Sequence, residues 1–203
     1  MRKLGVLIAI VVVLAVSAYA VDLGGGLVGF FASMEYPNSL IDTFATDNVL
    51  TIPGLHVGWG MDLSSSLFEF LDHGTMGLGM RYLAANTGAR DVSVGASLAG
   101  MYAWGGYRIG RWQLAIDAGG YRGSFSFPAA RYQNLVGWSG GVTGSVSYFA
   151  IATGTFSLGL AVSLQWLPIG EMHDTTGQRY RGRGAPFLDF SGISVSILFS
   201  WNF

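Results

Sequence analysis

The C-terminal stretch ISVSILFSWNF, residues Ile193 to Phe203, decides the fold. Every second residue from Ile193 onward is apolar, and the residues between them are small and polar apart from Leu198. Because side chains of a strand point alternately to its two faces, this pattern predicts a strand with one apolar and one mostly polar face. An oily outside and a polar inside are what a β-barrel in a bilayer requires.

The same alternation recurs along the chain and predicts eight strands. The first covers Leu23–Glu35 and has no clear parity, because glycines and paired phenylalanines interrupt it. The apolar series expected to face lipid in the next six strands begin at Leu55, Met76, Val92, Trp112, Val136 and Phe156. In the fourth strand, Val94, Leu98, Tyr102 and Trp104 are expected outside and Met101 inside. The fold class expected is all-β, a transmembrane antiparallel up-and-down barrel of eight strands.

Loop lengths and aromatic positions fit one orientation of such a barrel. We expect the connections 36–53, 84–91, 121–135 and 168–187 to be extracellular. Three of them are longer than the expected periplasmic turns, whereas 84–91 is short and the inner turn 64–74 is long. Aromatic residues are expected in two girdles. The outer girdle contains Tyr82, Trp138 and Trp166, and the periplasmic one contains Trp104, Trp112, Tyr148, Phe156, Trp201 and Phe203.

The N-terminus predicts export. Arg2 and Lys3 precede an apolar run, and Ala18-Tyr19-Ala20 provides the small residues of a cleavage site. We therefore expect residues 1–20 to be a cleaved signal peptide and residues 21–203 to be the barrel domain. The alternative is an uncleaved anchor, although the run is short for a helical span of about 20 residues.

Composition narrows the classes of partner. Without the first 20 residues, 9 basic residues face 12 acidic ones, a formal charge of −3. This weak field argues against nucleic acid as a partner. The sequence contains no cysteine and no metal-ligand spacing, so neither disulfides nor a cofactor are expected.

The ending of the chain resembles the C-terminal signature by which bacterial outer-membrane barrels are recognised by their assembly machinery. By that resemblance Phe199, Trp201 and Phe203 form an assembly signal. The architecture is similar to that of the OmpX, OmpW and OmpA transmembrane barrels, which implies the outer membrane of a diderm bacterium and contact with its lipids. OmpW-like members imply passage of small hydrophobic solutes, and OmpX-like members imply extended loops for adhesion or defence.

Larger polar residues are expected inside the barrel among glycines, serines and alanines. They are His56, Asp62, Arg81, Gln113, Asp117 and Gln165. Two interpretations stay open: a narrow hydrated path, or a polar plug in which Arg81 pairs with Asp62 or Asp117. Buried charges must be paired to persist, which favours the plug.

The expected outer loops contain two further candidates. Arg179, Arg181 and Arg183 recur at period two and can hold an anionic group of lipopolysaccharide or an acidic glycan. Alternatively, they pair with Glu171, Asp174 and Asp189 in a solvated loop. The first loop is unusually apolar, which fits either a hydrophobic funnel or a folded helix capping the barrel.

Catalysis is not expected. The small-barrel enzymes PagP and PagL share the architecture, but the His-x-Ser pair of PagL does not occur here at His56, His73 or His173. Two functions therefore stay open. The first is a narrow channel or carrier for small solutes, hydrophobic ones among them. The alternative is a closed barrel whose surface loops bind a host, glycan or lipopolysaccharide partner.

Overall fold

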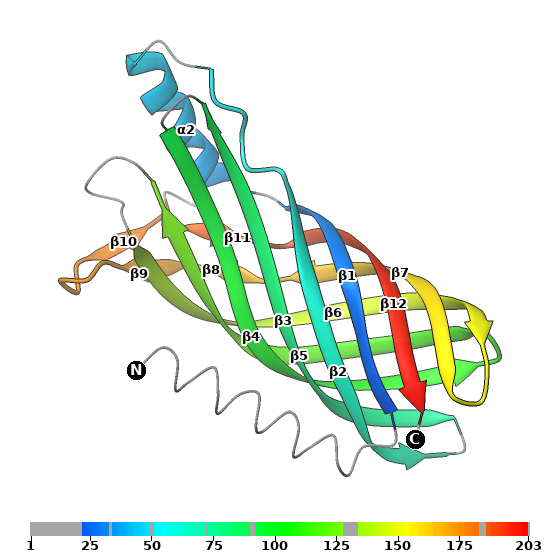
Figure 1. The fold of residues 1–203 in the computed structure, drawn as a ribbon. Helices are drawn as coiled ribbons and strands as arrows, with labels where there is room; N and C mark the ends of the chain where they lie inside the picture. The colour runs from blue at the N-terminus through cyan, green and yellow to red at the C-terminus, as the bar shows by residue number, and fades with distance from the viewer. Residues whose placement is uncertain are drawn as a thin grey trace.

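Eight antiparallel strands in the described part of the chain close into a barrel (Figure 1). The computed structural model describes residues 22–32, 34–48, 51–71, 73–89, 92–127, 134–182 and 186–202. The barrel strands are β1 (Asp22–Ala32), β2 (Val57–Phe70), β3 (Gly74–Ala89), β4 (Val92–Ile109), β5 (Trp112–Ser126), β6 (Leu135–Ala152), β7 (Phe156–Trp166) and β12 (Gly192–Asn202). The predicted fold class is confirmed.

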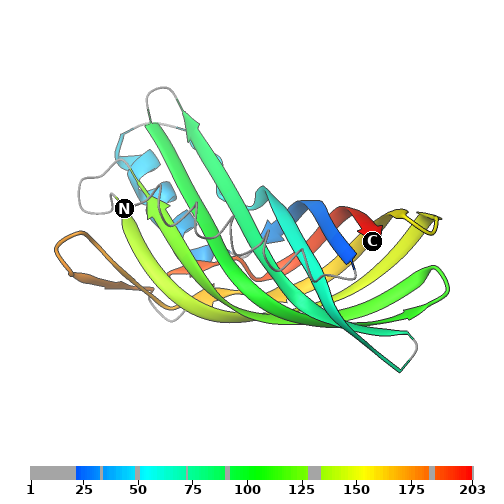
Figure 2. The ribbon, with the colours of Figure 1, turned by 60° about the horizontal axis from the view of Figure 1, so that its bottom comes forward.

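The first and last strands close the barrel. β1 pairs with β12 from Asp22 opposite Asn202 to Ala32 opposite Gly192 without a break in register. Neighbouring strands are otherwise joined in chain order. Because the free ends of β1 and β12 lie at the same end of the barrel, that end holds both termini of the described chain (Figures 1 and 2).

The two ends of the barrel differ in their connections. At the end that holds the termini, short turns join β2 to β3, β4 to β5 and β6 to β7. The opposite end holds the helix α2 (Glu35–Asp47) and the short strands β8 (Pro168–Ile169), β9 (Glu171–His173), β10 (Arg179–Arg181) and β11 (Leu188–Asp189). Outer-membrane barrels have short periplasmic turns and longer outer loops, so the helix end is the extracellular end.

The outer wall of the barrel is an apolar belt. Exposed side chains on alternating positions include Trp59, Leu114, Ile116, Leu160 and Ile197. Aromatic rings border the belt at both ends: Trp112 contacts Tyr148, Phe156 contacts Trp201, and Trp59 contacts Tyr82. An apolar belt with an aromatic rim at each membrane interface is the arrangement that a surrounding bilayer requires.

The parity predicted for the fourth strand is wrong. In β4, Val94 and Leu98 are fully buried inside the barrel, and Tyr102 also points inward. Met101 is exposed on the outer wall, and Trp104 lines the lumen instead of joining the periplasmic girdle. The upper lumen is filled by apolar side chains, so an apolar series in this strand does not identify the lipid face.

The outer loops are more ordered than the sequence indicates. β3 and β4 continue to Ala89 and from Val92, where a loop over 84–91 was expected. In the first loop, α2 buries Pro37, Ile41 and Ala45 at a spacing of four residues, which is one face of a helix. The helix therefore caps the barrel, as one of the two interpretations held. No helix among the described residues has both the length and the apolar character needed to cross a membrane.

Candidate functional site in the barrel lumen

A buried ion-pair layer crosses the middle of the lumen. Arg81 of β3 donates from Nε to Asp62 of β2 at 2.9 Å and from Nη2 to Asp117 of β5 at 2.9 Å. Its Nη1 donates to Asp117 at 3.2 Å and to the Thr143 hydroxyl of β6 at 2.7 Å. One side chain thus links four strands, and its exposed fraction is 8%.

Two tyrosines complete this layer. The Tyr102 hydroxyl donates to Asp62, and its ring lies 4.8 Å from the Arg81 guanidinium carbon. The Tyr121 hydroxyl is within 3.5 Å of Asp117. The two carboxylates are therefore held by hydrogen bonds from a single arginine and from phenols, which satisfies polar groups that would otherwise be buried alone.

Below this layer lies a cavity of about 420 Å³, lined by polar and apolar side chains together. Apolar side chains such as Val28 and Phe149 share its wall with a set of serines: Ser64, Ser66, Ser145, Ser147, Ser163, Ser194, Ser196 and Ser200. Exposed Glu69 and His73 line its lower end, beside the β2–β3 turn. The cavity therefore reaches from the ion-pair layer toward the periplasmic end.

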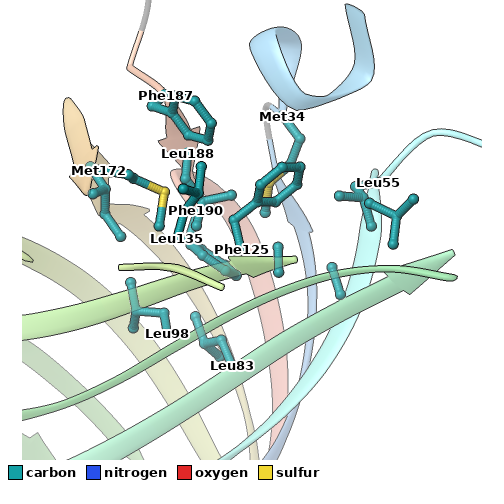
Figure 3. Packing of buried hydrophobic residues seen from close by; sticks show 14 of the residues in the cluster. Met34, Leu55, Leu83, Leu98, Phe125, Leu135, Met172, Phe187, Leu188 and Phe190 are labelled. Carbon is teal, nitrogen blue, oxygen red and sulfur yellow. The ribbon is translucent and has the colours of Figure 1, made fainter. Parts of the chain in front are cut away.

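Above the layer, the lumen is filled by an apolar cap (Figure 3). We use this name for the buried cluster formed by the upper strands, α2 and the last outer loop. Its fully buried members include Phe30, Met34, Ile41, Leu55, Leu83, Leu98, Phe125, Leu135, Met172, Phe187, Leu188 and Phe190. Rings of Phe125 and Phe187 meet edge-on at 5.6 Å, and those of Phe30 and Phe190 lie 5.7 Å apart. The cap occupies the extracellular half of the lumen.

The structure brings together only part of the polar set that the sequence suggested. Asp62, Arg81 and Asp117 form one network, and Gln113 lines the cavity below it. Gln165 also lines the cavity, and its amide donates to the Phe190 carbonyl at 2.7 Å, which ties the cap to β7.

His56 does not lie in the lumen. It precedes β2, is exposed, and is 3.3 Å from the Asn38 amide of α2. The alternation of β2 does not extend to His56, because the strand begins only at Val57.

Sequence reasoning missed Tyr102, which donates to Asp62. A Cβ on the neighbouring Gly79 would overlap the Tyr102 ring, so the ring occupies space that the glycine leaves. The signal for this pairing is a glycine opposite an aromatic residue, and it becomes visible only once the β3–β4 register is known.

The outer arginines lie on a small hairpin formed by β9 and β10. Glu171 accepts from Arg181 Nε at 2.6 Å and also approaches Arg179 Nε at 3.4 Å and His173 Nε2 at 3.1 Å. The hydrogen bond from Arg181 holds the pKa of Glu171 below its usual value. Asp174 and Asp189 do not join these pairs; they bind Thr176 and the Ser191 amide. Arg183 lies outside the described residues.

The remaining sequence candidates can be placed in part. Phe199 and Trp201 of the C-terminal strand contact each other with ring centroids 5.6 Å apart. Phe203 and the predicted signal peptide over 1–20 lie outside the described residues. Within the described ranges, no group of three or more histidine, acidic or cysteine side chains is placed to hold a metal ion.

A closed barrel with a lipid-facing belt, aromatic rims and folded outer loops defines the class of small outer-membrane β-barrels. Solved structures of this class are similar to the chain in fold. Ail of Yersinia pestis, in complex with the heparin analogue sucrose octasulfate, aligns with a TM-score of 0.53 at 9% identity, covering 89% of this chain and 96% of Ail. Neisserial surface protein A aligns with a TM-score of 0.51 at 13% identity, covering 90% of this chain and 96% of that protein. No protein-family model and no characterised protein sequence matches the chain.

Proposed function

We propose that the protein is a closed outer-membrane barrel whose folded extracellular end binds an anionic partner at the cell surface. The observation that supports this most is the apolar cap. It fills the extracellular half of the lumen with side chains that are buried as completely as a protein core. Among the residues that the structure describes, such close packing argues against a continuous water path, and removing a single buried aromatic ring costs on the order of 3–5 kcal/mol.

The second layer supports the same conclusion. The Arg81 network stands in the way of a path through the middle of the barrel, and its charges are paired with one another and hydrogen-bonded to Thr143, Tyr102 and Tyr121. Breaking a buried ion pair is strongly unfavourable. The lumen is therefore closed twice, once by charge pairing and once by apolar packing.

The binding half of the proposal is based on the outer surface. The β9–β10 hairpin holds Arg179 and Arg181 with 70% of each side chain exposed. Guanidinium groups bind phosphate, sulfate and carboxylate groups through paired N–H donors. Ail, similar to this chain in fold alone, is bound to a sulfated sugar in its structure.

Thiol labelling tests whether the lumen is closed from outside. Because the chain contains no cysteine, Ser163→Cys places a single thiol in the cavity wall. Ser126→Cys places one at the exposed outer end of β5 as the matched control. In porin-deficient cells, a membrane-impermeant methanethiosulfonate reagent should label the control in intact cells. It should label Ser163→Cys only after the outer membrane is permeabilised, so that the reagent reaches the cavity from the periplasmic end. Equal labelling of both thiols from outside would overturn the closed barrel.

A narrow channel or carrier is the second candidate function, and one observation favours it. The cavity of about 420 Å³ already extends through the periplasmic half, so only the ion-pair layer and the cap separate it from the outside. A cap that opens on contact with an apolar solute would bring the cavity closer to a connection with the outside of the cell. Labelling of Ser163→Cys from outside only when such a solute is added would support this candidate.

A further inference from the structure

A basic surface lies on the outer wall of the barrel, beyond the outer aromatic rim. It spans β5, β6, β9 and β10, which are neighbours in one sheet. The pairings place Ser124, Val136, His173 and Arg179 in one row across these strands. In the adjacent row, nearer the belt, Arg122 pairs with Trp138, and Glu171 pairs with Arg181. We call Arg122, His173, Arg179 and Arg181, together with Glu171, the basic face.

These side chains share one side of the sheet. Met172 and Tyr180 alternate with them along the hairpin and are buried toward the cap. In β5, Tyr121 is buried on the inside while Arg122 is exposed on the outside. The short hairpin is therefore amphipathic. Its apolar side closes the barrel, and its charged side continues the outer wall.

The basic face carries an excess of positive charge. Three arginines and one glutamate leave a formal charge of +2, with histidine neutral. Glu171 already accepts from Arg181 and faces Arg179 and His173, so one carboxylate serves three bases. Arg122 forms no ion pair with any side chain in the described ranges. Several guanidinium donors thus remain free for an external anion.

The position of the basic face specifies where that anion lies. Trp138, next to Arg122 in the register, is 73% exposed and belongs to the outer rim of the belt. Tryptophans at such rims lie at the level of lipid headgroups. The basic face therefore lies at and just above the headgroups of the outer leaflet, where lipid phosphates are within reach.

We propose that the basic face binds the phosphate groups of an outer-leaflet glycolipid, with Trp138 packed against the upper part of its acyl chains. This rests on the proposed function, because it names the partner of the same extracellular surface. Arginine forks suit phosphate oxygens, and anionic lipid attracts basic groups close to the membrane surface. A partner that is both phosphorylated and embedded in the bilayer satisfies the charge and the exposed tryptophan together.

Competition binding in neutral phospholipid nanodiscs tests the proposal. Refolded protein is titrated with fluorescently labelled bisphosphorylated lipid A, and binding is measured by energy transfer from the protein's tryptophans. Unlabelled competitors are bisphosphorylated lipid A, dephosphorylated lipid A, sucrose octasulfate and inorganic phosphate. We expect the bisphosphorylated lipid to compete at least about tenfold better than the dephosphorylated one, the equivalent of one charge-assisted contact.

The variants separate a specific surface from general lipid adhesion. Arg122→Gln/Arg179→Gln/Arg181→Gln should weaken binding of labelled lipid A at least about tenfold. Arg111→Gln changes an exposed arginine at the opposite end of the barrel and should leave binding unchanged. Since Arg122 forms no ion pair within the described ranges, Arg122→Gln alone should keep the fold and still weaken binding about threefold.

Three results would overturn the proposal. They are unchanged binding in the triple variant, equal competition by dephosphorylated lipid A, and displacement by sucrose octasulfate or inorganic phosphate as effective as by the lipid. The last would identify a soluble anion as the ligand. An open lumen with intact lipid A selectivity would contradict only the closed barrel. A closed lumen without that selectivity would contradict only the lipid partner.

Discussion

Replacing Arg81 with methionine should remove the centre of the ion-pair layer. Methionine approximates the length of the arginine stem but leaves Asp62 and Asp117 without their shared cation. The structure gives Arg81 hydrogen bonds to both carboxylates and to Thr143, at 2.7–3.2 Å. Removing one partner of a buried pair costs about 3–5 kcal/mol, because the remaining charge stays buried and uncompensated. The cavity beside the network gives water some access, so we expect about 3 kcal/mol for Arg81→Met.

Equilibrium urea unfolding in detergent micelles measures this loss, with the folded fraction read from heat-dependent gel mobility and tryptophan fluorescence. The matched control is the triple variant Arg81→Met/Asp62→Asn/Asp117→Asn, which has no charge in the layer. It should recover at least about half of the lost stability, because most of the penalty comes from unpaired carboxylates. An unfolding free energy of Arg81→Met within about 1 kcal/mol of the unchanged protein would refute this reasoning.

Three further predictions concern the cap, the lumen wall and the hairpin. Phe125→Ala removes a fully buried ring from the cap and should cost about 3–4 kcal/mol in the same urea assay; a loss below about 1 kcal/mol would mean that the cap is loosely packed. Gly79→Ala should lower the unfolding free energy by about 1–3 kcal/mol, because its Cβ would meet the Tyr102 ring. The control Gly144→Ala, whose Cβ would have no heavy atom within 4 Å, should change it by no more than about 0.5 kcal/mol, and equal losses in the two variants would contradict the packing. Because the pKa of Glu171 is lowered, its carboxylate stays ionised and its ion pairs persist until the pH falls through that lowered pKa. An NMR titration that gives Glu171 a pKa at or above about 4.3 would contradict the pairing.

The outer wall could be predicted from the sequence because lipid imposes one simple rule on it. Along β7 and β12, every outward position is apolar and most inward positions are small or polar. Period-two alternation therefore indicates both the strand and its orientation. The aromatic rims at Trp112, Tyr148 and Trp166 follow from the same rule.

The lumen was predicted less well because it has no single polarity. Its periplasmic half mixes polar and apolar side chains and its extracellular half is apolar, so inward residues of β4 change character along the strand. Leu98 belongs to the cap, whereas Tyr102, four residues on, binds Asp62. An alternation rule that assigns apolar residues to lipid inverts such a strand. The orientation of such a strand can be assigned only once the cap is known, and the cap is assembled from segments far apart in the sequence.

The Arg81 network shows what sequence chemistry alone can establish. A lone arginine with two aspartates on inward positions predicts an ion pair, because unpaired buried charge is too costly. The roles of Thr143 and Tyr102 depend on strand register, and register is not encoded in the alternation itself. The apolar first loop left two interpretations open, since a funnel and a packed helix need the same residues.

Planar-bilayer conductance of the refolded protein tests the closed lumen most directly. A folded barrel, checked by heat-dependent gel mobility, should show no steady conductance steps in salt solution, because both the Arg81 layer and the apolar cap cross the lumen. Arg81→Met should also stay silent, since the cap is still present. Reproducible conductance steps from the unchanged, fully folded barrel would contradict the closed lumen and establish a water path through it.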